Sequence, residues 1–257
     1  MVKSKQVFQI LEKFYRNVDL WKEVKEEMRG FKGFREKDFA SPFSNLVITI
    51  LSQNTNAKNT ARAYLNLLKK VGSITPENIL KLSERELSEA IKVGGLYRIK
   101  ARRIMLLAQK IVEEYGGSVN ELIVKGDPRR TRERLLALPG VGAKTADVFL
   151  AYCMKCGEIP IDRHITRITK RIGIVSRKAN YDEIKRELKK GIKRKDRVRF
   201  HELLIRFGKD ICRARNPLCE NCPLNAHCSW ERAQAGIRTR DCGSTGRHVT
   251  WLRHLGH

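Results

Sequence analysis

The sequence contains no apolar stretch of membrane-spanning length, so it predicts no helix that crosses a bilayer. Its first residues, MVKSKQVFQILEKF, follow an amphipathic helical pattern and lack the continuous apolar core of a signal peptide. We therefore expect an intracellular protein of the cytoplasm or nucleoid, with no membrane partner.

Acidic residues are scarce. The 257 residues include 28 Asp and Glu against 53 Lys and Arg, which gives a formal net charge of +25. The segment 231–257, rich in Gly, Arg and Thr, contributes only +3 of this charge, and the remainder carries +22. An excess of this size calls for a polyanionic partner, and nucleic acid ranks above an anionic membrane.

The sequence also lacks strand-like alternation and any repeat of fixed period. Apolar residues recur at helical spacing instead, for example through Phe43, Leu46 and Ile50. Helix starts are marked by N-cap residues followed by proline, at Ser41-Pro42, Thr75-Pro76 and Asp127-Pro128. These signals predict an all-α fold.

One stretch, LPGVGAKTA at 138–146, forms a turn between two helical patterns. Gly140 and Gly142 let the backbone turn tightly and approach another molecule closely, because neither has a Cβ atom. The amides of the turn and of the next helix then form an anion site that suits a phosphate. Since Lys144 and Asp162 lie nearby in the sequence, an amine and a carboxylate would accompany this site, which suggests chemistry on a nucleic acid.

Four cysteines follow near the end of the helical pattern, with the spacing C-x6-C-x2-C-x5-C. A disulfide framework is disfavoured because nothing indicates secretion. Structural zinc usually takes two close pairs separated by a longer span. A [4Fe–4S] cluster takes four thiolates, which one loop can supply, so we favour iron–sulfur over zinc. The predicted ligands are Cys212, Cys219, Cys222 and Cys228.

Cys153 and Cys156 form a separate C-x-x-C pair within a helical pattern. A thioredoxin-like role would require a βαβ context, which the sequence does not contain. We interpret these cysteines as small buried residues and assign no role to Cys242 in the tail.

In combination and in this order, LPGVGAKTA, IDRH at 161–164 and the cysteine loop resemble the endonuclease III family, within the helix-hairpin-helix DNA glycosylase superfamily. The resemblance covers roughly Lys5 to Trp230 and includes LSQNT at 51–55 and GLYRIKA at 95–101. A helix-hairpin-helix alone occurs in many DNA-binding proteins that are not enzymes. The combination of motifs is far more specific.

The resemblance implies two helical lobes with a DNA-binding cleft between them. A six-helix domain with the hairpin would span 40–156, and an iron–sulfur domain would combine 1–39 with 157–230. The remaining 231–257 would be an irregular or disordered basic tail. The expected partner is double-stranded DNA containing damaged bases or abasic sites, bound by a monomer and bent so that the damaged nucleotide flips out.

The activity implied is that of a bifunctional DNA glycosylase and AP lyase of base excision repair, acting on oxidised pyrimidines such as thymine glycol. Lys144 would attack C1′, expel the base and form a Schiff base, and β-elimination would cut the strand 3′ to the lesion. Asp162 would stabilise the cationic transition state. A plainer interpretation of Lys144 is a lysine that contacts a phosphate. A plainer interpretation of Asp162 is a helix N-cap, and this residue could serve as both cap and catalyst.

DNA contacts are also implied by the resemblance. The hairpin amides would bind a phosphate, the LSQNT segment would fill the hole left by the flipped base, and a leucine would wedge into the duplex, unless that leucine belongs to the core. The implied residues are Gly140, Val141 and Gly142 in the hairpin, Gln53 and Asn54 in LSQNT, and the wedge Leu96.

Other functions remain open. Glycosylases of the same fold act on mismatches, adenine, pyrimidine dimers or 8-oxoguanine, and a lysine at 144 argues against the first two. A different class would be a non-catalytic DNA-binding module with a structural or redox metal. The sequence decides neither the lesion nor whether a [4Fe–4S] cofactor has a redox role.

Overall fold

The computed structural model describes residues 3–16 and 41–230, and these ranges contain helices and no strands. The prediction of an all-α fold is confirmed. The tail with Cys242, and part of the segment predicted at 1–39, lie outside the described residues. Among the described helices, none combines the length and the apolar character that crossing a bilayer requires.

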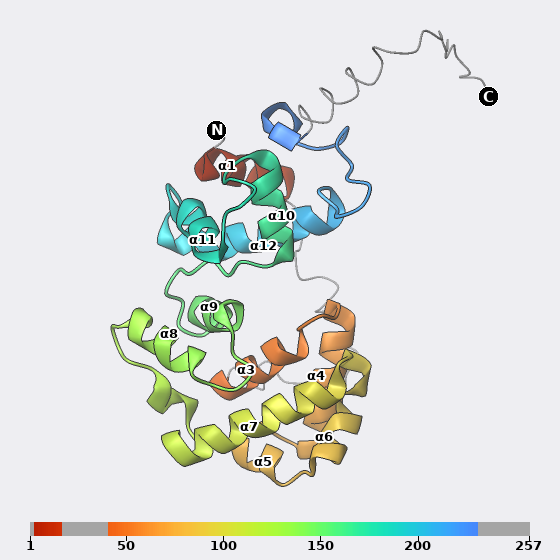
Figure 1. Cartoon of the computed structure of the whole chain (residues 1–257), viewed down its shortest axis with the longest axis vertical. Helices are drawn as coiled ribbons and strands as arrows, with labels where there is room; N and C mark the ends of the chain where they lie inside the picture. The colour runs from red at the N-terminus through yellow and green to blue at the C-terminus, as the bar shows by residue number, and fades with distance from the viewer. Residues whose placement is uncertain (1–2, 17–40, 231–257) are drawn as a thin grey trace, which may run out of the picture.

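The first lobe is the lower one in Figure 1, and its core is a single cluster of buried apolar side chains. Helix α3 crosses this lobe and contacts α4, α7 and α9. Because helices surround it, α3 is apolar on most of its faces. The helices of the lobe are α3 (Pro42–Leu51), α4 (Ala57–Val71), α5 (Pro76–Leu80), α6 (Glu84–Ala90), α7 (Tyr97–Tyr115), α8 (Pro128–Leu136) and α9 (Ala143–Tyr152).

Side-chain caps begin several helices of the first lobe where the sequence predicts. The Ser41 hydroxyl accepts a hydrogen bond from the Ser44 amide, and Thr75 and Asp127 cap α5 and α8 in the same way. Ser83 and Glu86 form a reciprocal capping box at the start of α6. Each cap satisfies an amide that the helix itself leaves without an acceptor.

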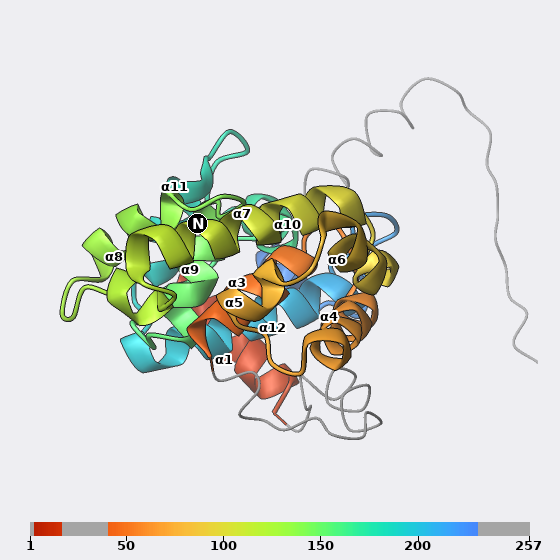
Figure 2. The same cartoon turned by 90° about the horizontal axis from the view of Figure 1, so that it is seen from below.

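The second lobe joins helices from the two ends of the described chain. Helix α1 (Ser4–Phe14) packs against α12 (Arg197–Asp210), and the Ser4 hydroxyl donates to the Glu187 carbonyl oxygen over 2.8 Å. Figure 1 shows α1 beside α10 (Arg163–Ile172), α11 (Tyr181–Lys189) and α12, and Figure 2 shows the two lobes from below. A second apolar core lies among these four helices.

The two cores meet at the segment that follows α9. Cys156 is the last residue of the first core, and Ile159 belongs to the second. The predicted boundary between 156 and 157 therefore stands as our proposal for dividing the chain. Cys156 is buried, as the sequence predicts, and its thiol donates to the Leu150 carbonyl oxygen over 2.9 Å, whereas Cys153 is only partly buried. No disulfide joins them.

Candidate active site

The hairpin connects α8, which ends at Leu136, to α9, which begins at Ala143. Gly140 has φ +77°, a left-handed conformation that favours glycine, and a Cβ here would lie 3.1 Å from Arg103 Cβ. Gly142 is the N-cap of α9, so no side-chain oxygen occupies the first amides of that helix. Val141 is buried in the first core, and the amide end of α9 has no side-chain cap, as the predicted anion site requires.

Lys144 and Asp162 come together in one cleft although they belong to different lobes. Lys144 is the second residue of α9, and its side chain is exposed on the cleft wall. The cleft measures about 580 Å³ and is lined from both lobes by Ser52, Gln53, Asn54, Thr55, Asn56, Ala57, Lys144, Ile161, Asp162, Arg163, His164, Ile205 and Lys209. The amine and the carboxylate thus face a single space.

A second, more apolar hollow of about 340 Å³ adjoins the cleft and shares Lys144 with it. It extends between α3 and α4 and is also lined by Thr49, Val148 and Tyr152. Lys144 therefore stands where two hollows meet.

Asp162 is the N-cap of α10. Its Oδ1 atom accepts a hydrogen bond from the Ile165 amide over 2.8 Å. The N-cap interpretation made from the sequence describes this contact correctly. Because a carboxylate has two oxygens, the cap still leaves Oδ2 for another partner.

The two residues predicted to probe DNA from LSQNT differ in their surroundings. The Gln53 amide donates to the Gly140 carbonyl oxygen over 3.3 Å, and its Oε1 accepts from Arg103 over 2.9 Å. Asn54 is exposed, with φ +52°. Gln53 thus ties this loop to the hairpin, and Asn54 presents its side chain outward.

Leu96 is the N-cap of α7 and is 49% exposed, with φ +49°. This exposure contradicts the alternative in which Leu96 is a core residue. Leu96 does not line the cleft itself, and a buried lysine connects its loop to the last residue of α3, next to the cleft residue Ser52. Lys100 donates to the Leu51 carbonyl oxygen over 2.7 Å and to the Gly94 carbonyl oxygen over 2.8 Å.

Lys100 is 1% exposed, and burial lowers its pKa to about 8. The sequence predictions do not include this residue. A signal for it exists, because Lys100 falls on the same face of α7 as the buried Ile104 and Leu107.

A second group absent from the predictions is the fully buried Asp147, one turn after Lys144 on α9. Its carboxylate accepts hydrogen bonds from Arg132 over 2.7 Å and from Lys185 over 3.0 Å. The Tyr181 hydroxyl donates to it over 2.7 Å. Its signal in the sequence is one acidic residue within the otherwise apolar run ADVFLAY.

Two histidines support the segment that carries Asp162. His164 packs against Gly208, where a Cβ would approach His164 Cβ to 2.8 Å, and burial lowers its pKa. His201 is buried in α12, and burial lowers its pKa to about 4. Its neutral ring donates from Nδ1 to the Pro160 carbonyl oxygen over 2.9 Å.

The cysteine loop follows α12 and folds back onto α10. Arg171 lies at both ends of the loop: its Nη1 is 3.7 Å from Cys212 Sγ, and its carbonyl oxygen is 3.7 Å from Cys228 Sγ. Cys219 and Cys222 share one turn, closed by a 3.2 Å backbone hydrogen bond. All four predicted ligands therefore belong to one compact loop.

The chemistry of this donor set fits a cluster. Within 3–16 and 41–230, no three His, Cys, Asp or Glu side chains converge on one point as ligands of a single ion would. In a [4Fe–4S] cluster each of four thiolates binds a different iron atom. Four thiolates in one loop are the ligand set that such a cluster requires.

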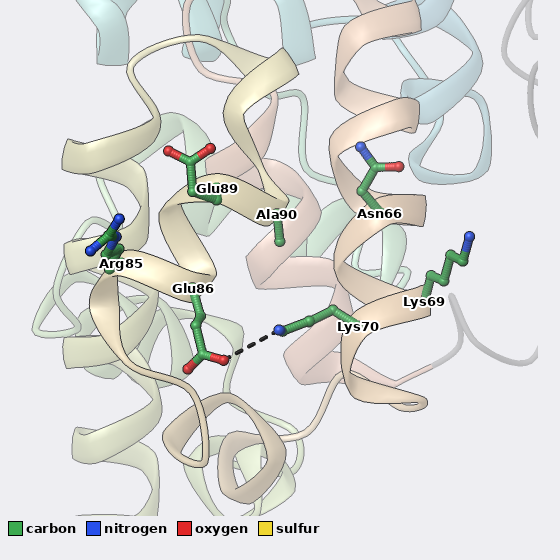
Figure 3. Close-up of a pocket in the computed structure, with 7 residues that line it drawn as sticks. All are labelled: Asn66, Lys69, Lys70, Arg85, Glu86, Glu89 and Ala90. Atoms are coloured by element: carbon green, nitrogen blue, oxygen red, sulfur yellow. Dashed lines mark hydrogen bonds and ion pairs between the residues drawn. The ribbon is translucent and has the colours of Figure 1, made fainter.

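Figure 3 shows another hollow, of about 680 Å³, between α4 and α6. It contains the exposed ion pair of Lys70 and Glu86, whose Nζ and Oε1 atoms are 3.2 Å apart. None of the predicted site residues lines it. This hollow therefore adds nothing to the candidate site.

Two family models match the chain. One describes an HhH-GPD superfamily base excision DNA repair protein and matches residues 47–194. The other describes the iron-sulfur binding domain of endonuclease III and matches residues 212–228, which hold the four cysteines. Together they cover the hairpin, the cleft and the cysteine loop.

Similar proteins include Endonuclease III of Sulfolobus acidocaldarius, which is 35% identical over 73% of this chain and 82% of its own length. Endonuclease III of Thermotoga maritima is 35% identical over 77% of this chain and 89% of its own length. A solved non-covalent Endonuclease III–DNA complex superposes with a TM-score of 0.73, at 27% identity, over 92% of this chain and 100% of its own. A trapped Endonuclease III–DNA covalent intermediate has a TM-score of 0.73 at 26% identity, covering 91% of this chain and 100% of the other.

Proposed function

The chain belongs to the HhH-GPD superfamily of base excision DNA repair proteins, and we propose that it removes oxidised pyrimidines from double-stranded DNA as a bifunctional glycosylase and AP lyase. The observation that carries this proposal is the placement of Lys144 and Asp162, from two lobes, in one cleft. Both come from the same chain, so we propose that a monomer is active.

DNA binding would begin at the hairpin. The open amides at the start of α9 offer hydrogen bonds to one phosphate, and the net charge of +25 attracts the backbone as a whole. Exposed Leu96 would wedge into the duplex while Asn54 fills the space vacated by the flipped nucleotide. Gln53 would contribute by holding this loop against the hairpin.

The chemistry would take place at the Lys144 amine. Its lone pair attacks C1′, the N-glycosidic bond breaks, and the electron pair leaves with the base, which takes up a proton. The amine nitrogen loses a proton, its lone pair then expels O4′ as the C1′–O4′ bond breaks, and O4′ takes up a proton, which leaves a protonated Schiff base on the opened sugar. Loss of a proton from C2′ breaks the bond to the 3′ phosphate oxygen and cuts the strand.

Attack requires a neutral amine. Arg163 and Lys209 line the same cleft as Lys144 and would attract the DNA backbone to it. DNA laid across the cleft would also displace water from it. Asp162 would stabilise the positive charge that develops on the sugar as the base departs.

A [4Fe–4S] cluster, held by Cys212, Cys219, Cys222 and Cys228, is the cofactor of the iron–sulfur binding domain. When bound, it supplies four iron–thiolate bonds that cross-link the loop. Arg171 and Arg167 attach the loop to α10, and Arg167 donates to the Cys212 carbonyl oxygen over 3.0 Å. The loop in turn supports the lobe that carries Asp162.

The lesion class rests on two observations. Two relatives that match most of the chain are named Endonuclease III, and the cysteine loop accompanies the lysine here. A lysine at 144 disfavours mismatch and adenine glycosylases. We therefore propose oxidised pyrimidines, with thymine glycol as the first substrate to test.

Borohydride trapping tests the proposal directly. The holoenzyme is incubated with duplexes containing thymine glycol, 8-oxoguanine, a pyrimidine dimer, a mismatch or an abasic site, and the Schiff base is reduced. We expect a covalent adduct with the thymine glycol and abasic duplexes, and its loss in Lys144→Ala.

Lys81→Ala is the matched control, because Lys81 is an exposed lysine at the C-cap of α5, outside the cleft. The Lys81→Ala variant should form as much covalent adduct as the wild type. Binding without any adduct in wild type and Lys144→Ala alike would instead support a non-catalytic DNA-binding module.

A further inference from the structure

The proposed nucleophile, Lys144, and the proposed stabilising carboxylate, Asp162, belong to different lobes, so the distance between them depends on contacts across the junction. We propose that the buried Asp147 and the partly buried Tyr181 are positioning residues that hold Lys144 and Asp162 in a fixed relative position. The inference rests on the proposed function and adds two residues to it.

Asp147 fixes the first-lobe side of the junction. It lies three residues after Lys144, so the two share one face of α9, and Figure 1 shows that α9 faces the second lobe. Its carboxylate has no exposure to solvent and holds donors from both lobes: Arg132 of α8, and Tyr181 and Lys185 of α11. Because a buried charge is costly without partners, these donors strongly constrain where α9 can lie.

Tyr181 transmits this constraint to the residue before Asp162. Its hydroxyl donates to Asp147 Oδ2 over 2.7 Å and accepts from the Ile161 amide over 3.3 Å. Burial, together with the nearby charge of Asp147, raises the pKa of Tyr181, so the phenol keeps the proton that it donates. One oxygen atom thus connects the helix of Lys144 with the backbone of Asp162.

The segment that precedes Asp162 is otherwise bound to the second lobe. Gly157 accepts from Arg197 over 3.0 Å, Glu158 forms a 2.7 Å ion pair with Lys189, and Pro160 accepts from His201 over 2.9 Å. These contacts hold 157–160 against α11 and α12. The position of this segment relative to α9 therefore depends on contacts between the lobes such as those of Asp147.

Tyr181→Phe removes the shared oxygen and keeps the aromatic ring. The Ile161 amide then loses its acceptor and Asp147 loses one donor, while Arg132 and Lys185 remain. We expect the single-turnover rate of base release to fall about tenfold, because misplacement of a catalytic group costs rate steeply. Affinity for a duplex with an uncleavable abasic analogue should change less than threefold, since no DNA contact is removed.

The decisive readout is a double-mutant cycle with Asp162→Asn. If Tyr181 acts by placing the Asp162 carboxylate, Tyr181→Phe should have little further effect once that carboxylate is gone. Lys185→Met, which removes another contact between the lobes, should slow base release in the same direction. Tyr115→Phe is the control, because it removes a tyrosine hydroxyl at the far end of α7.

Unchanged base release in both Tyr181→Phe and Lys185→Met would overturn the inference. An equal slowing by Tyr181→Phe in wild-type and Asp162→Asn backgrounds would do so too, because that result indicates a general loss of structure. These outcomes require that the wild type releases base. If it does not, the proposed function itself fails, so the two failures are distinguishable.

Discussion

At the scale of single residues, the Asp162 carboxylate accepts the Ile165 amide as an N-cap does, and it also lines the cleft that contains Lys144. Aspartate and asparagine are almost equally good N-caps, but only aspartate carries charge. Substitution with asparagine therefore separates the structural contribution of this residue from its electrostatic one.

For Asp162→Asn we predict a change in the free energy of unfolding below about 1 kcal/mol, because the cap survives. Base release should fall by about a hundredfold, because the charge that stabilises the transition state is lost. Asp162→Ala should slow base release by the same factor and should be about 1 kcal/mol less stable than Asp162→Asn. Urea unfolding and single-turnover kinetics measure the two effects.

Asp127→Asn provides the matched control, since Asp127 caps α8 through a 2.9 Å bond to the Arg130 amide and does not line the cleft. It should keep wild-type base release. Wild-type base release in Asp162→Asn would show that Asp162 is only a cap.

Lys100 gives a pH prediction at the same scale. Its pKa in the folded protein is about 8, below the ordinary value of 10.5, so between these values the unfolded chain binds more protons at this site. Stability therefore gains with rising pH through this window. We predict that the unfolding free energy of wild type minus that of Lys100→Met increases from pH 8 to pH 10.

Lys110→Met on the same helix is the comparison. Lys110 pairs with Glu114, and that hydrogen bond raises its pKa, so this variant should not show the increase. A flat difference between wild type and Lys100→Met, measured by urea unfolding across the same pH range, would contradict the prediction.

At the scale of elements, the hairpin depends on Gly140. An alanine there must adopt φ +77° and place its Cβ 3.1 Å from Arg103 Cβ. Gly126 has the same φ of +77°, and a Cβ there would meet nothing within 4 Å. Comparing alanine substitutions at these two glycines therefore distinguishes the effect of backbone strain from the effect of crowding against Arg103.

We predict that Gly126→Ala lowers the free energy of unfolding by about 1 kcal/mol, the cost of a left-handed alanine. Gly140→Ala should lower it further and weaken binding to an abasic-analogue duplex by about tenfold, because the turn that presents the phosphate-binding amides shifts. Fluorescence anisotropy measures binding. Equal affinities in the two variants would argue against phosphate binding at this hairpin.

The elements were largely predictable because their signals are local. Ser41-Pro42, Asp127-Pro128 and the Ser83 capping box mark helix starts within a few residues of sequence. Lys100 and Asp147 were not predicted, although each interrupts an apolar face. Lys100 bonds to Leu51, which is 49 residues away in the sequence, and Asp147 bonds to Lys185, which is 38 residues away. No local sequence pattern indicates such contacts.

At the scale of the whole molecule, the two lobes have separate apolar cores and share one cleft. The sequence indicated the chemistry of the cleft through residue types and spacing. It could not show that Gln53 bonds to the hairpin while Asn54 faces outward, because neighbouring residues on one loop carry no signal of their direction.

The order of the lobes along the chain has a consequence for synthesis. Helices α3 to α9 are continuous in sequence, whereas α1 packs against α12, which a ribosome completes almost two hundred residues later. The hairpin lobe can thus fold during translation, before α12 is available to pack against α1. A nascent chain would carry the lysine early but complete the cleft only after α12 has been made, because Ile205 and Lys209 of that helix line it.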